Sequence, residues 1–310
     1  MKQLKRLDAI PRDPYQRALK SRLRHIALSE DAFNELRRTQ QDHVVIEDAG
    51  LLIAQPYQGA IGLQYAFPNS YQFARHFPTM FSRLLPALTI EEAPMGIRLR
   101  HTDAASRPYV EPVLRAHAFE MMRDWIRMEL AELPPSGGPE DHIAAGGEAG
   151  AFTLREARTD DAEAIVEVES VAFSMSWLTP DVVRRSVEQE PVFRVLEDVS
   201  SGRAVGFLQL RTDLPSEGYV SDIALHPEYQ RRGLGEAMMR WALARFREDG
   251  LRCAALTVTS DNGPGIALYR KLGFTAAETG IDYHRPIDED EVRQVLEKNR
   301  ASRITVRTRY

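Results

Sequence analysis

The residues best suited to chemistry lie between Ser221 and Gly235, where a predicted strand leads through a turn at Pro227 into a helix. Gly233 and Gly235 open that helix, and two arginines come just before them. The first backbone N–H groups of a helix have no partner inside it, and the helix dipole adds partial positive charge there. Glycine lets an anion approach such a backbone closely. The spacing therefore predicts a loop that binds phosphate groups.

The elements around this loop fit the same role. Alternating β-forming residues over 219–225 predict a strand, and apolar residues at helical spacing over 234–246 predict a helix. A second strand is predicted at 253–259. A turn and a short helix follow, which Pro264 begins and Gly273 ends. A last strand, at 281–284, is expected to close the C-terminal half.

Two motifs here resemble the signatures of the GNAT superfamily, the acyl-CoA-dependent N-acetyltransferases. Gln230, Gly233 and Gly235 match the pattern Gln/Arg-x-x-Gly-x-Gly/Ala. The second signature is matched by Asn262, Ala267, Leu268, Tyr269, Gly273 and Phe274. The resemblance extends from residue 151 to about residue 287. It implies an α/β fold of the GNAT type, with a central mixed β-sheet flanked by helices.

The resemblance also implies acetyl-CoA as co-substrate and no metal. Backbone groups of Ile223 and Leu225 would bond the pantetheine arm as an added strand does, while the loop holds the pyrophosphate. A larger acyl donor remains an alternative. The residues expected to contact the cofactor are Ile223, Ala224, Leu225, Gln230, Arg231, Arg232, Gly233, Leu234, Gly235, Glu236, Asn262 and Tyr269.

Acetylation of an amine needs a base for the amine and an acid for the departing thiolate. Deprotonation at pH 7 costs about 4.6 kcal/mol for a lysine-like amine and about 1.1 kcal/mol for an α-amino group. Glu217 is the candidate base, with a surface turn residue as the other interpretation and Asp222 as the alternative base. Tyr269 is the candidate acid, or else an aromatic core residue. Tyr283 is a second candidate acid, since ribosomal-protein N-terminal acetyltransferases use a tyrosine at a similar place.

The acceptor is expected to be a small-molecule amine or a peptide or protein amino group, which attacks directly in a ternary complex. Trp177, in the loop between the first two helices of the C-terminal half, is the candidate acceptor contact or else a core residue. A different class of function is a coenzyme A-binding sensor, or a partner-binding module without turnover. Such a protein would keep the loop and lack a working base.

A stretch rich in Pro and Gly predicts a linker at 134–150. It would separate an N-terminal domain (1–133) from a catalytic domain (151–287), with a helical tail at 288–310.

The N-terminal half repeats the C-terminal pattern when Phe119 is aligned with Phe274, which predicts two tandem GNAT-like domains; a coincidence of two helix–strand units is the alternative. The N-terminal copy lacks Gly-x-Gly over 66–70 and has Leu114 in place of the tyrosine. We expect this degenerate copy not to bind coenzyme A.

Composition excludes several other classes of protein. A net charge of −5 over 310 residues argues against a nucleic-acid partner. No apolar run is long enough to cross a bilayer, and the basic, helical N-terminus is not expected to be a secretory segment, because it has no apolar core. A single cysteine excludes an internal disulfide framework, and the eight histidines lack the spacing of metal ligands. We expect a cytoplasmic protein without a membrane partner, and a homodimer stays open.

Overall fold

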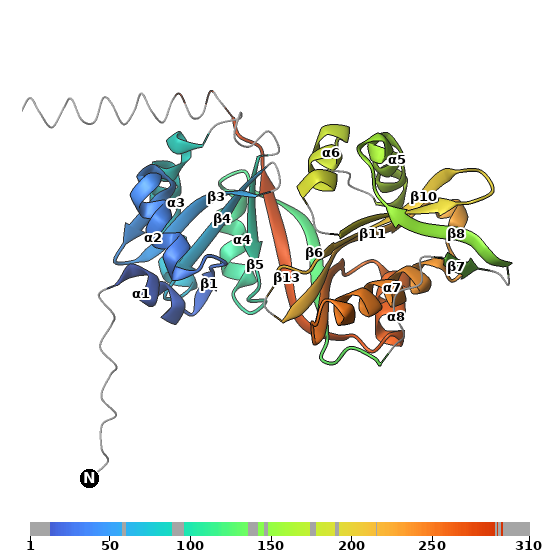
Figure 1. Ribbon diagram of the computed structural model, residues 1–310. Helices are drawn as coiled ribbons and strands as arrows, with labels where there is room; N and C mark the ends of the chain where they lie inside the picture. The colour runs from blue at the N-terminus through green and yellow to red at the C-terminus, as the bar shows by residue number, and fades with distance from the viewer. Residues whose placement is uncertain are drawn as a thin grey trace, which may run out of the picture. The chain divides into compact units, whose positions relative to one another are not determined.

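The computed structural model describes residues 13–57, 60–88, 96–135, 142–145, 148–173, 178–189, 192–214, 216–288, 290 and 293. The chain divides into two compact units. The first unit comprises Met1–Trp125 with Thr279–Tyr310, and the second comprises Ile126–Glu278. Each is a mixed sheet with helices on both faces, in agreement with the predicted α/β class (Figure 1).

The first unit contains strands β1 (Leu23–His25), β2 (Val44–Glu47), β3 (Gly50–Tyr57), β4 (Ala60–Phe67), β5 (Ile97–His101) and the end of β13 (Thr275–Arg285). Its helices are α1 (Pro14–Lys20), α2 (Glu30–Thr39), α3 (Ser70–Leu84) and α4 (Arg107–Arg115). Neighbouring strands follow the order β2-β3-β4-β5-β13, and β1 pairs with β4. Only β4 and β5 are parallel among these described pairs.

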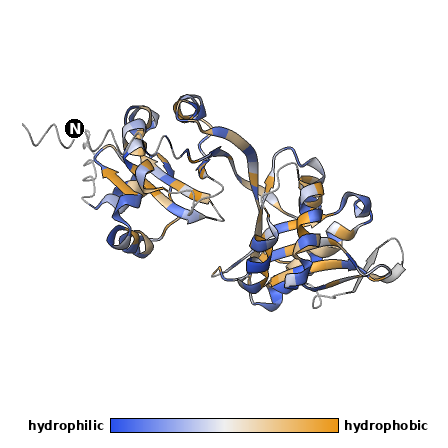
Figure 2. Cartoon of the chain, turned by 90° about the horizontal axis from the view of Figure 1, so that it is seen from above, coloured by the Kyte–Doolittle hydropathy of each residue, from blue (hydrophilic) through white to orange (hydrophobic). Residues whose placement is uncertain are grey.

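Two apolar layers hold the first unit together. On one face of the sheet, α3 and α4 pack over a core rich in aromatic residues, including Phe73, Phe77 and Phe81. On the other face, Tyr15 of α1 and Phe33 of α2 pack against the sheet. In each unit, hydrophobic residues gather on the strands and on the helix sides that face them (Figure 2).

The second unit contains the end of β6 (Glu120–Leu130), then β7 (His142–Ala145), β8 (Glu148–Glu156), β9 (Val192–Asp198), β10 (Arg203–Arg211), β11 (Glu217–Leu225) and β12 (Cys253–Thr259). Its helices are α5 (Ala162–Ala172), α6 (Pro180–Gln189), α7 (Leu234–Glu248) and α8 (Gly263–Lys271). The strand order is β6-β12-β11-β10-β9-β8-β7, with β11 and β12 parallel. Short 3-10 turns occupy Gln41–His43, Leu85–Ala87, Thr159–Asp161 and Pro227–Tyr229.

Helices α5 and α6 cover one face of the second sheet, and α7 and α8 cover the other (Figure 1). The close packing of α7 requires a glycine at residue 218, because a Cβ added there would lie 2.3 Å from the Phe246 ring. Within the described residues, no helix is long and apolar enough to cross a membrane.

The two units exchange their last strands along the chain. β13 follows the elements of the second unit, yet Ile281–Arg285 pair antiparallel with β5 of the first. β6 follows the elements of the first unit, yet its residues 126–130 belong to the second, where β6 neighbours β12. The expected closing strand at 281–284 therefore exists but completes the other sheet. Local sequence patterns indicate the order of elements along the chain, but they carry no information on which sheet edge a strand joins.

The division of the chain consequently differs from the expected boundaries at 133, 151 and 287. Part of the predicted linker is also ordered as strands, because β7 and the start of β8 form an antiparallel pair with His142 opposite Thr153. Linker residues 136–141 and 146–147 lie outside the described residues, as does the predicted tail apart from residues 288, 290 and 293.

Replacing Tyr283 by Ala should destabilise the first unit by about 3–5 kcal/mol, because a fully buried ring of β13 leaves a cavity beside β5. Hydrogen exchange read by mass spectrometry should become faster in β4 and β5 while β10 and β11 keep their wild-type rates. Glu278→Ala, an exposed change on the same strand, is the control and should alter neither unit. Loss of protection confined to the second unit would contradict the strand exchange.

Candidate active site

The loop between β11 and α7 has an unusual backbone. Arg231 and Gly233 adopt φ angles of 63° and 82°, in the left-handed region that costs a side-chain-bearing residue about 1–2 kcal/mol. The first hydrogen bond of α7 runs from Ala237 N–H to Gly233 O, and no side chain caps the helix. The N–H groups of the first turn therefore point toward an anion that approaches along the helix axis.

Side chains of the loop hold it in this shape. Gln230 donates through Nε2 to Leu225 O at 3.1 Å, and Arg232 donates through Nη2 to Glu228 O at 2.7 Å. The Arg232 guanidinium also lies over the Tyr229 ring, 5.0 Å from its centre. Gln230 and Arg232 thus support the predicted phosphate site from within the loop.

Three further residues predicted to contact the cofactor differ in what they present. Leu234 is buried in the core, so only its backbone is available. Gly235 leaves room, since an added Cβ would touch only Leu225 and Leu268 at 3.6 Å. Glu236 pairs with Lys271 and Arg240, whose hydrogen bonds lower the pKa of its carboxyl. This pairing offsets a negative charge that would otherwise face an incoming phosphate.

The pairing of strands β11 and β12 ends before β11 reaches this loop. Their parallel ladder joins residues 217–220 to residues 253–256, and the described pairing ends at Val220 and Leu256. Both strands continue beyond that point, to Leu225 and Thr259. A strand that leaves its neighbour exposes one row of backbone donors and acceptors. The row lies on the β12 side of β11 and leads toward the loop.

The direction of the exposed N–H groups follows from the ladder on the other side of β11. His226 N–H donates to Val205 O at 2.9 Å, toward β10. Successive residues of an antiparallel strand alternate in direction, so Leu225 and Ile223 direct their N–H groups away from β10. These are the two backbones expected to bond the pantetheine arm. The N–H group of Ala224, which stands opposite Phe207, points toward β10, so it does not join this row.

An irregularity in β11 sits where the two strands separate. Gln209 of β10 lies opposite Asp222, while the next residue, Leu210, lies opposite Val220. Ser221 thus has no residue opposite it, which is the signature of a β-bulge. A bulge shifts the alternation of side chains by one position, and such shifts often occur beside active sites.

The bulge brings Asp222 onto the face that carries Glu217. Before the bulge, Gly218 contacts Phe246 of α7, so Glu217 and Tyr219 point to the opposite face. After it, Ala224 packs with the cluster formed by α5 and α6, so Asp222 shares that face. Simple alternation cannot reveal this arrangement, because the sequence does not mark the bulge.

Glu217 is paired with a residue that the sequence analysis did not single out. Arg127 of β6 donates through Nη2 to both carboxylate oxygens of Glu217, at 2.8 and 2.7 Å, and through Nε to Glu129 at 2.8 Å. Its guanidinium lies 5.8 Å from the centre of the Tyr219 ring, and Tyr219 donates to Thr257 Oγ1 at 2.8 Å. We call the set Arg127, Glu129, Glu217, Tyr219, Asp222 and Thr257 the polar face.

Two residues of the second motif, Tyr269 and Asn262, lie within α8 and at its start. Tyr269 is 7% exposed and packs edge-on against Phe274, and burial raises the pKa of its phenol to about 12. The phenol is therefore a proton donor throughout the neutral range. Asn262 caps α8, since its Oδ1 accepts from Gly265 N–H at 2.9 Å. A role for Asn262 in cofactor contact would come in addition to this cap.

The second candidate acid, Tyr283, does not join this group. Tyr283 is fully buried in the core of the first unit, where burial raises its pKa to about 12. Its hydroxyl makes no hydrogen bond of ordinary geometry within the described residues, although the charges of Glu111 and Arg107 lie close. The strand exchange is the reason for this placement. Trp177 lies outside the described residues.

Residues 162–274 match the Acetyltransferase (GNAT) family. This protein carries a GNAT acetyltransferase domain. The matched range contains β11, α7, β12 and α8, and so the whole loop and the separating strands described above. The described part of the chain contains no cluster of three or more His, Cys, Asp or Glu residues that could hold a metal ion.

Three known proteins illustrate the similarity. A mycothiol acetyltransferase of Corynebacterium glutamicum is 37% identical over 81 residues, which is 26% of this chain and 28% of that protein. A ribosomal protein bS18 alanine N-acetyltransferase of Escherichia coli is 27% identical over 139 residues, 45% of this chain and 91% of that protein. A solved tandem GNAT protein from the clavulanic acid biosynthesis pathway superposes with a TM-score of 0.51 at 14% identity, covering 77% of this chain and 80% of that one. The last shows the tandem GNAT fold alone.

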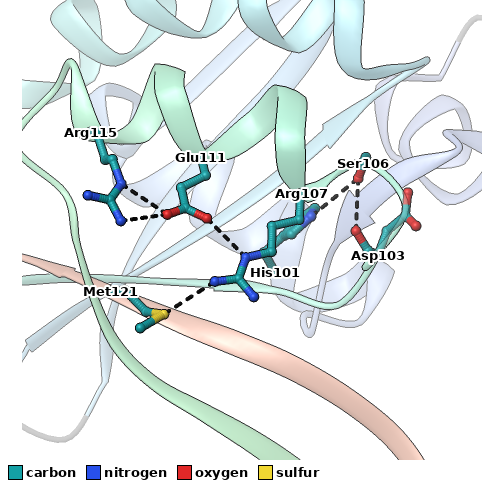
Figure 3. A network of polar contacts seen from close by, with 7 residues as sticks. All are labelled: His101, Asp103, Ser106, Arg107, Glu111, Arg115 and Met121. Carbon is teal, nitrogen blue, oxygen red and sulfur yellow. Dashed lines mark hydrogen bonds and ion pairs between the residues drawn. The ribbon is translucent and has the colours of Figure 1, made fainter.

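In the first unit, the helix that follows β4 has a capped start, unlike α7. Only Pro68 and Asn69 connect β4 to α3, and Asn69 caps that helix by accepting from Gln72 N–H at 2.9 Å. The helix end that would face a phosphate is thus satisfied by the chain itself. At the start of α4, His101 and Asp103 hydrogen-bond Ser106, and Glu111 pairs with its neighbouring arginines (Figure 3).

Replacing Gly235 by Asp should weaken coenzyme A binding about 100-fold, because a carboxylate would lie a few ångströms from the pyrophosphate. The fold should be unharmed, since the Cβ has room and an acidic residue suits the first turn of a helix. Calorimetric titration measures the affinity.

Tyr71→Asp is the matched control, at the second residue of α3 and well exposed. Its affinity for coenzyme A should equal that of the wild type. If Tyr71→Asp abolished binding and Gly235→Asp did not, the anion site would belong to the first unit.

Proposed function

We propose that this protein transfers an acetyl group from acetyl-CoA to a primary amine by direct attack in a ternary complex. The observation that carries the proposal is the row of outward N–H groups that runs from Ile223 and Leu225 into the uncapped first turn of α7. A pantetheine arm needs strand-like partners and a pyrophosphate needs several N–H donors, and this row offers both in sequence. The family match over residues 162–274 supports the same donor.

Acetyl-CoA would supply the acetyl group as a thioester. The first turn of α7 and the loop at 230–233 would hold its pyrophosphate, and Ile223 and Leu225 its pantetheine arm. One of those N–H groups would polarise the thioester carbonyl, which would lower the barrier as negative charge develops on that oxygen. Asn262 and the backbone of α8 would complete the groove.

Protons move in two places as the new bond forms. The amine nitrogen bonds to the carbonyl carbon and gives up a proton to Glu217, directly or through water, and the C–S bond then breaks. Tyr269 gives its phenol proton to the departing sulfur and regains one from solvent. Its high pKa keeps that proton available at neutral pH. Glu217 and Tyr269 thus act from different elements, β11 and α8.

The charge of the polar face favours a cationic acceptor. Glu217, Glu129 and Asp222 make the polar face rich in acidic side chains, and Arg127 pairs with the first two of them. A surface of this sign attracts an ammonium group and lowers the free energy of its encounter. The names of the relatives point to a small molecule in one case and to an alanine of a ribosomal protein in the other, so the proposal covers an amine on a small molecule or on a peptide.

Tyr269→Phe should lower kcat about 100-fold with little change in the KM for acetyl-CoA, because it removes a proton donor and keeps the packing. The loss should be constant between about pH 7 and pH 10, since a phenol with a pKa of about 12 stays protonated over that range. Release of the coenzyme A thiol during a screen of amines and peptides measures turnover. Glu217→Gln should lower kcat similarly.

Tyr15→Phe is a suitable control, because that phenol donates to Leu28 O within the first unit. The alternative function is a coenzyme A-binding sensor without turnover. It would be favoured if wild-type protein bound coenzyme A yet released no thiol with any amine. A wild-type protein that failed to bind coenzyme A would overturn both proposals.

A further inference from the structure

We propose that Arg127 is a positioning residue for Glu217, supplied to the catalytic unit by the N-terminal half of the chain through strand β6. The inference rests on the proposed function and extends it. It assigns to the strand exchange a role in the reaction. Nothing in the two GNAT motifs points to this residue, which lies 90 positions before Glu217 along the chain.

The contact between the two side chains is close and doubled. Nη2 of Arg127 lies 2.8 and 2.7 Å from the two carboxylate oxygens of Glu217. Hydrogen bonds between charged groups are shorter and stronger than neutral ones, and the guanidinium plane restricts their direction. Each carboxylate oxygen has two acceptor sites, so the pair still leaves free positions for an amine or a water molecule.

Arg127 is itself held from two other directions. Its Nε donates to Glu129 at 2.8 Å, two residues along the same strand. Its guanidinium also faces the Tyr219 ring. Burial works against the charge of Arg127, but the hydrogen bonds that its guanidinium donates to Glu217 and Glu129 outweigh this effect and raise the pKa of the guanidinium. Arg127 is therefore a fixed cation, and a fixed cation can fix its partner.

The exposure of the pair argues that its value is not stability. The side chains of Arg127 and Glu217 are 26% and 24% exposed. Ion pairs that solvent reaches add little to the free energy of unfolding, because water screens them and ordering long side chains costs entropy. What the pair does change is the freedom of Glu217. Without Arg127, the Glu217 side chain, which solvent partly reaches, would sample several rotamers, and only some of them would place its oxygens near the amine.

The test is a double-mutant cycle on the full chain, with the amine that gives the highest turnover in the wild-type screen. Arg127→Met and Glu217→Gln should each lower kcat at least 10-fold with an unchanged KM for acetyl-CoA. The double variant should be no slower than Glu217→Gln alone, because Arg127 acts only through Glu217. Arg127→Lys, which keeps one charged donor, should recover part of the loss.

The matched control is Arg155→Met. Arg155 also pairs with two carboxylates, Asp161 and Glu197, in the same unit and at similar exposure. Its loss should leave kcat within twofold of the wild type. Thermal unfolding of all variants shows whether each is folded at the assay temperature.

Three results would overturn the inference. One is a kcat for Arg127→Met equal to that of the wild type, and another is a double variant slower than Glu217→Gln by the full factor of Arg127→Met. The third is an equal fall in kcat for Arg155→Met. If wild-type protein binds coenzyme A but turns over no amine, the proposed function fails first and this inference fails with it. Turnover with additive variants refutes the inference alone.

Discussion

The candidate site depends on one constraint: a backbone N–H group without a partner in the fold needs one from outside. The bulge at Ser221 and the end of the β11–β12 ladder expose such groups on β11, and the left-handed Arg231 and Gly233 start α7 without a cap. These features lie in one continuous stretch of chain. Together they form a surface that suits an elongated ligand with a strand-like arm and an anionic end.

The two units show how small a change separates an open helix end from a closed one. α7 begins at a glycine after a loop that starts at His226, whereas α3 begins at Asn69 after only Pro68. The asparagine satisfies the helix that the glycine leaves open. The N-terminal half still contributes to the other unit, because β6 carries Arg127, which pairs with Glu217. The N-terminal half, in which the start of α3 is capped, thus also supplies a residue of the polar face.

Much of this architecture could be predicted from the sequence, and the reasons for the exceptions are physical. Local patterns predicted the strand before Pro227, the helix after Gly233 and the helix that Pro264 begins, since each rests on neighbouring residues. The bulge, the exchange of β6 and β13 and the Arg127–Glu217 pair all depend on hydrogen bonds between distant segments. No local pattern marks them. Asn262 illustrates a subtler limit, because a motif residue can serve as a helix cap as well as a ligand contact.

Hydrogen exchange of the free protein and of the protein saturated with coenzyme A tests the central claim most directly. The account predicts slower exchange of the amides of Ile223 and Leu225, which point away from β10, and of residues 231–236, which have no partner among the described residues. It predicts no change over residues 67–72 at the capped start of α3. Protection confined to residues 67–72, or tight binding that slows neither segment, would contradict it.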